Sequence, residues 1–451
     1  MRTVLLSTAP PDDPALASLL EIVRTELTSA RHTVTAFDVS DGKIGYCQGE
    51  FDCWVRTPGR CTIEDVQQKI VAAMAGADAL VLVGPIAFGG FGHLLKRSID
   101  RLLCLLSPFF EKRALLTHHE PRYDDSPALY AIGLLAPSLA PEEAAAQAAT
   151  FEALNDANAL NLLAPFRGAL AVDPAHPERW AHDVRVLLAE ADEPGATLDD
   201  RDALRAELMA AARPEPAPVP PRGRIASAAV VVGSPKEKGT SASELLARAF
   251  VRALEASGVR CELRFAVEMV NGSAHAGETA RAIAGADLLL LCAPLYVDAL
   301  PSPTTRALEL VARARAEGVG PRDAMVVPLV NCGFPEPEQT RTALRILRHF
   351  ARAGGYRWGG ALPLGAGAVV TPERSLDVAR PPVAHVVNAI ALAAPALAAG
   401  EAVPAAALDE ILRPPMPEVL YRLAGDLGWR LQARTRGATQ RSLRARPLRP
   451  H

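Results

Sequence analysis

Two stretches of the chain repeat one pattern, and this repeat constrains the fold more than any other feature of the sequence. Residues 75–85 and 284–294 both begin Ala-Gly-Ala-Asp, continue as an apolar run and end at a proline. Unbroken apolar runs of this length are typical of parallel strands buried on both faces. When the two stretches are aligned, Arg97 falls opposite Arg306 and Asp100 opposite Glu309. We interpret the sequence as a tandem duplication of one α/β domain.

Strand and helix patterns alternate on both sides of a proline-rich segment, residues 213–224. Prolines at this density continue neither a helix nor a sheet ladder, so we expect a semi-rigid, extended linker. The predicted domains are residues 1–212 and 225–405, followed by a helical, arginine-rich tail at 406–451. Besides the strands in the two repeats, we predict strands at 4–6, 33–37, 128–135, 168–172, 228–232, 260–265, 324–330 and 361–364, and helices at 14–29, 242–256 and 418–435. Such alternation favours parallel sheets.

Composition and charge exclude several classes of protein. The net charge of −3 provides no chain-wide attraction for nucleic acid, and no apolar run reaches the roughly 20 residues of a spanning helix. Seven cysteines, an odd number, do not suggest a disulfide framework. We therefore expect a cytoplasmic protein without membrane or nucleic-acid partners. Seven arginines and no acidic residue follow from position 430 onward, and we interpret them as a solvated or self-docked tail rather than a nucleic-acid arm.

The segment at 233–243, which follows the first strand of the second domain, has the composition of an anion-binding loop. Glycines let the backbone wrap an anion, hydroxyls donate hydrogen bonds, and a helix N-terminus follows. Two of the chain's six lysines lie here. The predicted phosphate-binding residues are Ser234, Lys236, Lys238, Gly239, Thr240, Ser241 and Ser243. The alternative is an ordinary capped helix start. The segment is neither a Walker A loop nor a dinucleotide fingerprint, which disfavours a nucleoside triphosphatase or a Rossmann dehydrogenase.

Two further loops are expected at the same sheet edge, because ligands of open parallel sheets bind beyond the carboxyl ends of the strands. The loop after the third strand, 294–303, combines an aromatic residue with apolar neighbours, which suits a flat ring. The loop after the fourth strand, 331–335, contains a glycine where a ligand could approach the backbone. The predicted ring-contacting residues are Pro294, Leu295, Tyr296, Val297, Asn331 and Gly333.

These loops resemble those of the flavodoxin-like NAD(P)H-dependent FMN reductases. In that family Gly-Ser-Pro-Lys…Gly-Thr-Ser, at 233–241, would bind the FMN phosphate, and Ala-Pro-Leu-Tyr, at 293–296, would contact the isoalloxazine. The resemblance implies two tandem flavodoxin-like, doubly wound domains, each with a five-stranded parallel sheet in the order 2-1-3-4-5. It also implies an oxidoreductase that uses FMN and NAD(P)H and reduces a quinone, flavin or other small acceptor. No side chain is nominated as a catalytic acid or base, because the flavin carries the chemistry.

The first domain resembles the same family through a cysteine-bearing segment at 47–61 and through the loop and helix at 84–101. Related iron–sulfur flavoproteins carry another cysteine where this chain has Glu50, and a [4Fe–4S] cluster normally needs four thiolates. Cys47, Cys53 and Cys61 supply three. We therefore expect a structural loop, with no metal ligands, and keep an iron–sulfur cluster as the alternative.

The first domain departs from the family at its own first loop, residues 7–14. This loop has no glycine, three prolines and two carboxylates, so we expect no FMN phosphate there. The resemblance also suggests an internal pseudo-dimer, in which segment 47–61 covers the flavin of the second domain, and a further homo-oligomer is compatible with it. The alternative functions are an electron-transfer module and a non-catalytic scaffold that has lost flavin turnover.

Overall fold

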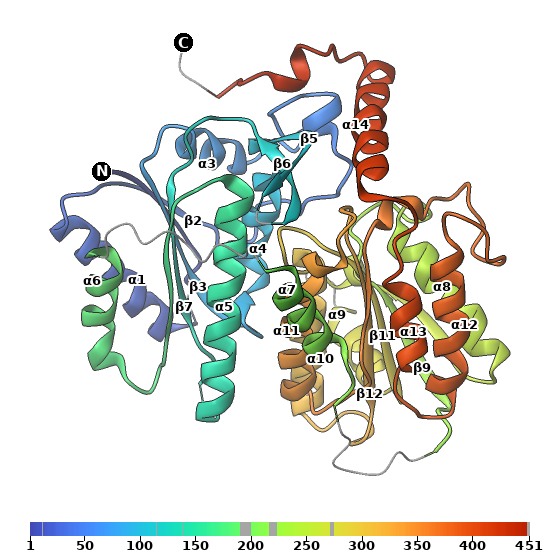
Figure 1. Ribbon diagram of the computed structural model, residues 1–451. Coiled ribbons are helices and arrows are strands. Elements are labelled where there is room, and N and C mark those ends of the chain that lie inside the picture. Colours follow the sequence, from blue (N-terminus) through green and yellow to red (C-terminus); the bar gives the residue numbers. More distant parts are fainter. Residues whose placement is uncertain are drawn as a thin grey trace. The chain divides into compact units, whose positions relative to one another are not determined.

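The structure is a computed structural model that describes residues 1–10, 12–113, 115–137, 139–189, 200–215, 223–270 and 275–448. The chain divides into two compact units. Unit 1 consists of Met1–Ala114, His118–Leu198 and Leu423–His451, and unit 2 consists of Leu115–Thr117 and Asp199–Arg422. Each unit is built around its own parallel sheet, so the expected α/β class with two flavodoxin-like domains is confirmed (Figure 1).

Unit 1 contains a parallel sheet in the order β2-β1-β3-β7-β8, which is the predicted 2-1-3-4-5 order. Its strands are β1 (Arg2–Ser7), β2 (Thr33–Asp38), β3 (Ala79–Ala87), β7 (Ala128–Leu134) and β8 (Phe166–Val172). Its helices are α1 (Pro14–Ser29), α2 (Asp52–Val55), α3 (Gln67–Met74), α4 (His93–Asp100), α5 (Pro141–Leu162) and α6 (Trp180–Ala189). Leucines of α1 and Val184 of α6 share one core with Val81 and Ile132 of the sheet, so these helices cover one face. Phe151 of α5 packs beneath Gly133, on the other face.

Unit 2 repeats this topology in the order β10-β9-β11-β12-β13. Its strands are β9 (Ser227–Val232), β10 (Arg260–Phe265), β11 (Leu288–Pro294), β12 (Met325–Asn331), β13 (Arg357–Trp358) and β14 (Leu362–Leu364). Its helices are α7 (Arg201–Ala212), α8 (Ala242–Ala256), α9 (Ala276–Ala284), α10 (Ser302–Ala316), α11 (Arg341–Ala353), α12 (Ala384–Ala398) and α13 (Ala405–Ile411), and α14 (Glu418–Thr435) begins here. Figure 1 shows α8 and α12 on one side of this sheet and α10 and α11 on the other.

The helices begin where the sequence supplies caps. The Asp13 carboxylate accepts a hydrogen bond from the Leu16 N–H, and Pro14 occupies the first turn of α1. In α8 the Ser241 hydroxyl accepts from the Glu244 N–H at 3.1 Å. The predicted bounds of α1, α8, β10 and α14 agree with the structure, because periodic apolar residues and end signals coincide in these segments.

A tight turn follows the central strand of each sheet, β3 in unit 1 and β11 in unit 2. In unit 1, β3 pairs antiparallel with β4 (Gly90–Phe91) through a turn at Phe88 and Gly89, with φ of +57° and +85°. In unit 2 the turn lies at Val297 and Asp298, with φ of +48° and +53°. The residue offset that aligns the two Ala-Gly-Ala-Asp repeats also aligns these turns. This match supports the duplication, which stays a prediction.

The structure differs from the expected domain organisation in two places. Helix α7 groups with unit 2, although the sequence assigned residues up to 212 to the first domain, because Glu207 of α7 pairs with Arg341 and Arg345 of α11. Residues 423–448 group with unit 1 instead of forming a separate tail. Within the expected linker, residues 216–222 lie outside the described part of the chain.

Two strand assignments also differ from expectation. The strand predicted at 361–364 is β14, but it is preceded by a two-residue strand that was not predicted, β13, and Gly360 between them has φ of +89°. An additional pair of strands, β5 (Leu106–Arg113) and β6 (Leu116–Pro121), was not predicted.

Candidate functional site

The loop between β9 and α8 contains the predicted phosphate-binding residues, and its two glycines serve different purposes. A Cβ on Gly233 would lie 2.7 Å from the Ala293 Cβ, so this glycine permits close packing of β9 against β11. Gly239 has φ of +87°, and a Cβ there would meet no heavy atom within 4 Å. The loop is therefore open at Gly239, where a ligand could approach the backbone.

The Gly239 N–H donates to the Glu244 carboxylate at 2.5 Å. The other carboxylate oxygen of Glu244 pairs with Arg248 at 2.7 Å, and the Glu244 side chain is only 2% exposed. A backbone N–H at the start of a helix is the donor that a phosphate would use. The sequence analysis missed Glu244, because an acidic residue in the first turn of a helix is common.

The other polar side chains of this loop have local partners. Lys238 pairs with Glu268 at 2.8 Å and lies over the Phe265 ring at 4.4 Å. The Thr240 hydroxyl donates to the Glu237 carbonyl, and the Ser234 hydroxyl accepts from the Lys236 N–H at 3.3 Å. Ser241 caps α8. These contacts fix the loop conformation, while the role of the residues in phosphate binding stays a prediction.

The three predicted loops meet at Asn331, the last residue of β12. The Ser243 hydroxyl donates to the Asn331 side-chain oxygen at 2.8 Å, and both side chains are buried. The Leu295 N–H donates to the Asn331 carbonyl at 2.9 Å. The phosphate loop and the two ring loops are thus connected through one asparagine, as the expected common sheet edge requires.

The turn after β11 holds its residues in a strained conformation. Tyr296 and Ala299 exchange backbone hydrogen bonds of 2.8 and 3.2 Å, which places Val297 and Asp298 at positive φ. A β-branched residue rarely adopts this conformation, and such strain persists only where surrounding contacts enforce it. Here the Thr342 hydroxyl donates to the Asp298 carbonyl. The turn therefore has a fixed shape beside Pro294, Leu295 and Tyr296.

The loop after β12 is covered by a residue that the sequence analysis did not find. A Cβ on Gly333 would meet nothing within 4 Å, but the Gly333 carbonyl accepts a 2.7 Å hydrogen bond from the Tyr421 hydroxyl of α14. Burial raises the pKa of Tyr421 above its ordinary value. Cys332 is also buried, which raises the pKa of its thiol, and its sulfur lies 3.4 Å from two backbone carbonyls. Cys332 is therefore a packed thiol.

These observations test whether FMN fits unit 2. Open positions at Gly239 and Gly333 and the helix start at Ser241 suit a flavin and its phosphate. The Glu244 carboxylate opposes the phosphate, because two anions in one loop repel each other. The site fits FMN provided that Glu244 turns away from Gly239.

Unit 1 fills the corresponding helix start with its own carboxylate. The Asp13 side chain accepts the Leu16 N–H at 3.0 Å, and Thr8 is 1% exposed, with its hydroxyl packed against Gly84. That this loop does not bind the FMN phosphate stays a prediction.

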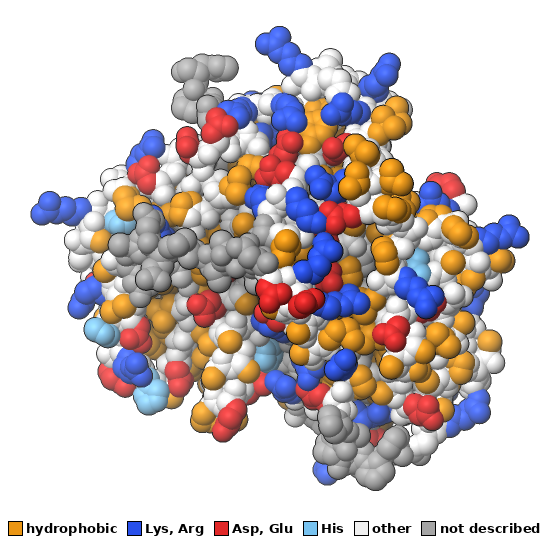
Figure 2. Space-filling view, viewed as in Figure 1, with side chains coloured by type: hydrophobic (Ala, Val, Ile, Leu, Met, Phe, Trp, Pro, Cys, Tyr) orange, Lys and Arg blue, Asp and Glu red, His pale blue; other side chains and the backbone are white. Residues whose placement is uncertain are grey.

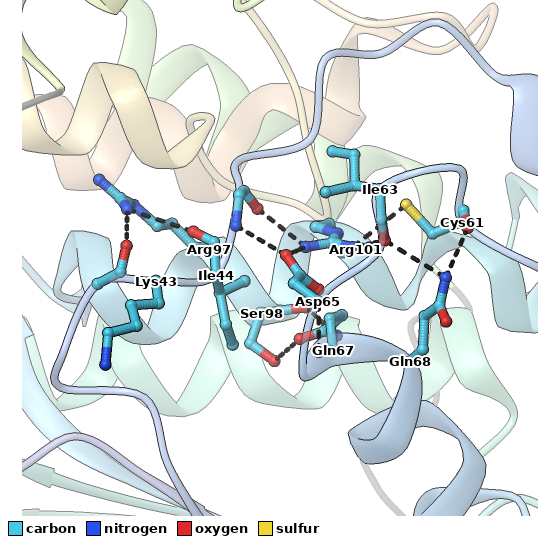
Figure 3. Close-up of polar contacts among 12 residues, drawn as sticks. Lys43, Ile44, Cys61, Ile63, Asp65, Gln67, Gln68, Arg97, Ser98 and Arg101 are labelled. Carbon is cyan, nitrogen blue, oxygen red and sulfur yellow. Dashed lines mark hydrogen bonds and ion pairs between the residues drawn. The ribbon is translucent and has the colours of Figure 1, made fainter.

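The cysteine-bearing segment of unit 1 is held by basic side chains of α4 and the turn that follows it (Figure 3). Arg97 donates to the Gly42 and Ile44 carbonyls at 2.8 and 3.3 Å. Arg101, whose side chain is fully buried, pairs with Asp65 and donates to the Ile63 carbonyl at 3.0 Å. The same guanidinium lies 3.4 Å from the Cys61 sulfur. The segment is thus anchored at both ends.

In the structure Cys53 is buried, and Cys47 and Cys61 are half-buried. In the described part of the chain, no group of three or more His, Cys, Asp or Glu side chains is arranged to hold a metal ion. Burial raises the pKa of the Cys47 and Cys53 thiols and raises the pKa of Cys104 to about 12. A structural loop stays the prediction for this segment, with an iron–sulfur cluster as the alternative.

The C-terminal segment of unit 1, residues 423–448, packs on this same region. Trp429 lies edge-on to Phe51 and Trp54, with ring centroids 5.2 Å apart in both pairs. Arg436 pairs with Asp52 at 2.8 Å. Arg444 pairs with Glu120, and Arg446 pairs with Asp124. Three arginines of the tail therefore have acidic partners in unit 1.

One side of α14 remains exposed. Figure 2 shows hydrophobic side chains along this helix, and the exposed apolar residues on it are Val419, Leu420, Leu423, Leu427 and Leu431. Among the described residues, no helix is long and apolar enough to cross a membrane.

We expect unit 1 to lose stability on acidification because of His119. Burial lowers the pKa of His119 to about 3, and the positive charge of Arg113 acts in the same direction. The folded state thus favours the neutral imidazole, and its stabilising effect is lost as the pH falls from about 6.5 towards 3. Between pH 7.5 and 5.0 the loss from this group is about 2 kcal/mol.

Urea denaturation at the two pH values measures this loss. His119→Gln should reduce the difference between the two pH values, whereas His176→Gln, at an exposed histidine paired with Glu178, should not. An unchanged pH dependence in His119→Gln would contradict the assignment.

Comparisons with known proteins support the family resemblance. Residues 1–176 match the family described as NADPH-dependent FMN reductase. An iron–sulfur flavoprotein of Archaeoglobus fulgidus is 31% identical over 83 residues, which cover 18% of this chain and 40% of that protein. The chain thus spans about two fifths of the length of this curated relative. The predicted resemblance to the FMN reductases is confirmed for residues 1–176.

Two solved structures of other proteins also match parts of the chain. An NAD(P)H:quinone oxidoreductase from Methanothermobacter marburgensis is 14% identical with a TM-score of 0.34, and the match covers 43% of this chain and 99% of that chain. A WrbA-like flavodoxin from Agrobacterium tumefaciens is 14% identical with a TM-score of 0.24, over 47% of this chain and 99% of that chain.

Proposed function

We propose that this chain is an FMN-dependent oxidoreductase that transfers reducing equivalents from NAD(P)H to a quinone, flavin or other small acceptor, with FMN held by unit 2. The observation that carries the proposal is the junction at Asn331, the last residue of β12, which is hydrogen-bonded to Ser243 in the first turn of α8 and to Leu295 after β11. The family match at residues 1–176 supports the reaction class. The open backbone at Gly239 and Gly333 favours unit 2 as the flavin site.

Each loop has a distinct part in this proposal. The helix start at Ser241 and the N–H of Gly239 would bind the phosphate. The fixed turn at Val297 and Asp298 would hold the backbone beside Tyr296 against the ring. Tyr421 would restrict water at the loop that contains Gly333, because its hydroxyl is bonded to that carbonyl. The flavin, when bound, would supply the hydride-accepting and electron-relaying chemistry.

The Gly239→Asp variant should lose FMN binding. Aspartate adds a carboxylate in the open space of the phosphate loop, and the expected loss of affinity is at least about 100-fold. Gly318→Asp is the matched control: Gly318 has φ of +83° and equally open space, but it follows α10 at the opposite edge of the sheet. Backbone strain is therefore similar in both variants. Titration with FMN, followed by flavin fluorescence, measures the difference.

The absorption spectrum of the purified protein tests the proposal directly. FMN that is bound on purification, or taken up on titration, supports the proposal if Gly239→Asp abolishes its binding and Gly318→Asp does not. A colourless protein that takes up no FMN would overturn it. Equal loss of binding in Gly239→Asp and Gly318→Asp would contradict the placement of the phosphate in this loop.

A second candidate function is an electron-transfer module or scaffold without flavin turnover. It is favoured by the carboxylates of Asp13 and Glu244. Each of them already accepts a hydrogen bond from a backbone N–H that a phosphate would otherwise use. Oxidation of NAD(P)H with an added quinone distinguishes the two functions, since only the oxidoreductase consumes NAD(P)H catalytically. The internal pseudo-dimer, with segment 47–61 covering the flavin, is retained as part of the first proposal. If FMN quenches the tryptophan fluorescence of the protein and this quenching is lost in Trp54→Phe, the pseudo-dimer is supported.

A further inference from the structure

Glu244 is a buried acidic residue beside the β9–α8 loop. Among the contacts given for the described residues, it is the one buried carboxylate that accepts a backbone N–H of this loop. Its carboxylate accepts the Gly239 N–H at 2.5 Å and is 2% exposed. An anionic ligand that used the same N–H would meet this carboxylate at contact distance. Like charges at such a distance repel each other strongly when both are shielded from water.

The helix start does not depend on this carboxylate. The Ser241 hydroxyl already caps α8 by accepting the Glu244 N–H, so the cap remains when the Glu244 side chain moves. Arg248 lies one helical turn further along α8, is half-exposed and pairs with Glu244 at 2.7 Å. Glu244 can therefore leave Gly239 and keep an ion pair at the surface.

Unit 1 differs on this point. There Asp13 is itself the cap of α1, through the Leu16 N–H, so its carboxylate cannot leave without exposing the helix start. In unit 2 the cap and the carboxylate are separate residues, Ser241 and Glu244. In unit 2 a ligand could therefore displace the carboxylate that contacts the loop at no cost to the helix cap.

We propose that Glu244 competes with the phosphate of the flavin for the Gly239 N–H, so that unit 2 distinguishes poorly between FMN and an unphosphorylated flavin. This inference rests on the proposed function, because it assumes that unit 2 binds a flavin. FMN binds only when the Glu244 side chain has turned towards Arg248. Riboflavin has the same ring and no phosphate, and it leaves Glu244 in place. Glu244 is therefore a specificity-determining residue of the flavin site.

The Glu244→Gln variant tests the competition. Glutamine keeps the size of the side chain and an oxygen that accepts the Gly239 N–H, but it removes the negative charge. We expect affinity for FMN to rise about tenfold, equivalent to about 1.4 kcal/mol, and affinity for riboflavin to stay unchanged. Dissociation constants for both flavins are measured by fluorescence titration of the full chain. Glu317→Gln, at an ion pair with Arg281 on the opposite edge of the sheet, is the control and should change neither affinity.

The outcomes are distinguishable. Suppose that the unmodified protein and Glu244→Gln both bind flavins. If the substitution then raises the affinity for FMN and riboflavin equally, or changes neither affinity, the competition is wrong and the proposed function stands. If neither flavin binds to either protein, the proposed function itself is overturned, and the inference with it. Thermal unfolding shows whether Glu244→Gln is folded. Glu244→Ala, which also removes the charge, must give the same change in FMN preference.

Discussion

The Asp100→Asn variant is expected to lose about 3–5 kcal/mol of unfolding free energy, because it leaves the Lys96 ammonium buried beside a neutral amide. Lys96 and Asp100 form an ion pair one turn apart on α4, and their side chains are only 5% and 1% exposed. The same stretch of chain contains Arg97 and Arg101, which hold the cysteine-bearing segment. Loss of the buried pair should therefore loosen that segment as well.

Two further variants separate charge from packing at this site. In Lys96→Met/Asp100→Leu both charges are removed together, and most of the stability should return, because no buried charge is left uncompensated. Asp41→Asn breaks a Lys–Asp pair on the surface, where the Lys43 side chain is 82% exposed, and should leave the urea midpoint unchanged. Urea denaturation followed by tryptophan fluorescence compares the three variants. The prediction would be contradicted if Asp100→Asn lost no more unfolding free energy than Lys96→Met/Asp100→Leu.

The Arg122→Met variant should destabilise unit 1 by about 3–5 kcal/mol and release the end of the tail, because four backbone carbonyls lose a charged donor. The Arg122 guanidinium is buried and donates to the Cys104 and Leu106 carbonyls at 3.1 and 3.0 Å. It also donates to the Leu443 and Ala445 carbonyls at 2.9 and 2.8 Å. Burial lowers the pKa of Arg122, yet the guanidinium remains charged at any ordinary pH.

Limited proteolysis reports on the tail directly. In Arg122→Met, cleavage after the arginines beyond residue 440 should accelerate, because the tail detaches more often. Arg446→Met is the control: Arg446 pairs with Asp124 at the surface, where the Asp124 side chain is 61% exposed. Its cleavage rate at the remaining arginines and its urea midpoint should stay close to those of the unmodified protein. Equal behaviour of the two variants would show that Arg122 does not hold the tail.

The sequence predicts well those elements whose signals are local. Helix α8 has a serine cap and a periodic apolar face, and the repeats at 75–85 and 284–294 contain buried parallel strands. The meeting of three loops at one sheet edge follows from the topology alone. Unit boundaries were harder to predict, because α7 joins unit 2 through ion pairs to residues more than a hundred positions away.

The candidate site shows the same limit. Ser243, Leu295 and Asn331 could be chosen from loop composition, and the structure brings them together. Glu244 could not be recognised, since nothing in the sequence shows that its carboxylate folds back onto Gly239. Tyr421 contacts Gly333 across 88 positions of the chain, and a lone tyrosine in a helical tail carries no signal of such a contact. Long-range side-chain contacts are therefore what the sequence analysis lacked.

The docking of residues 423–448 on unit 1 has a consequence for synthesis on the ribosome. Unit 1 is interrupted after residue 198, and its remaining part begins at residue 423. At about 5–20 residues per second, the ribosome needs roughly 10–45 s to translate the intervening stretch. During that time the nascent first unit lacks Trp429, which packs against Phe51 and Trp54, and the carbonyls that Arg122 binds. The first unit to emerge from the ribosome is therefore the last to be completed.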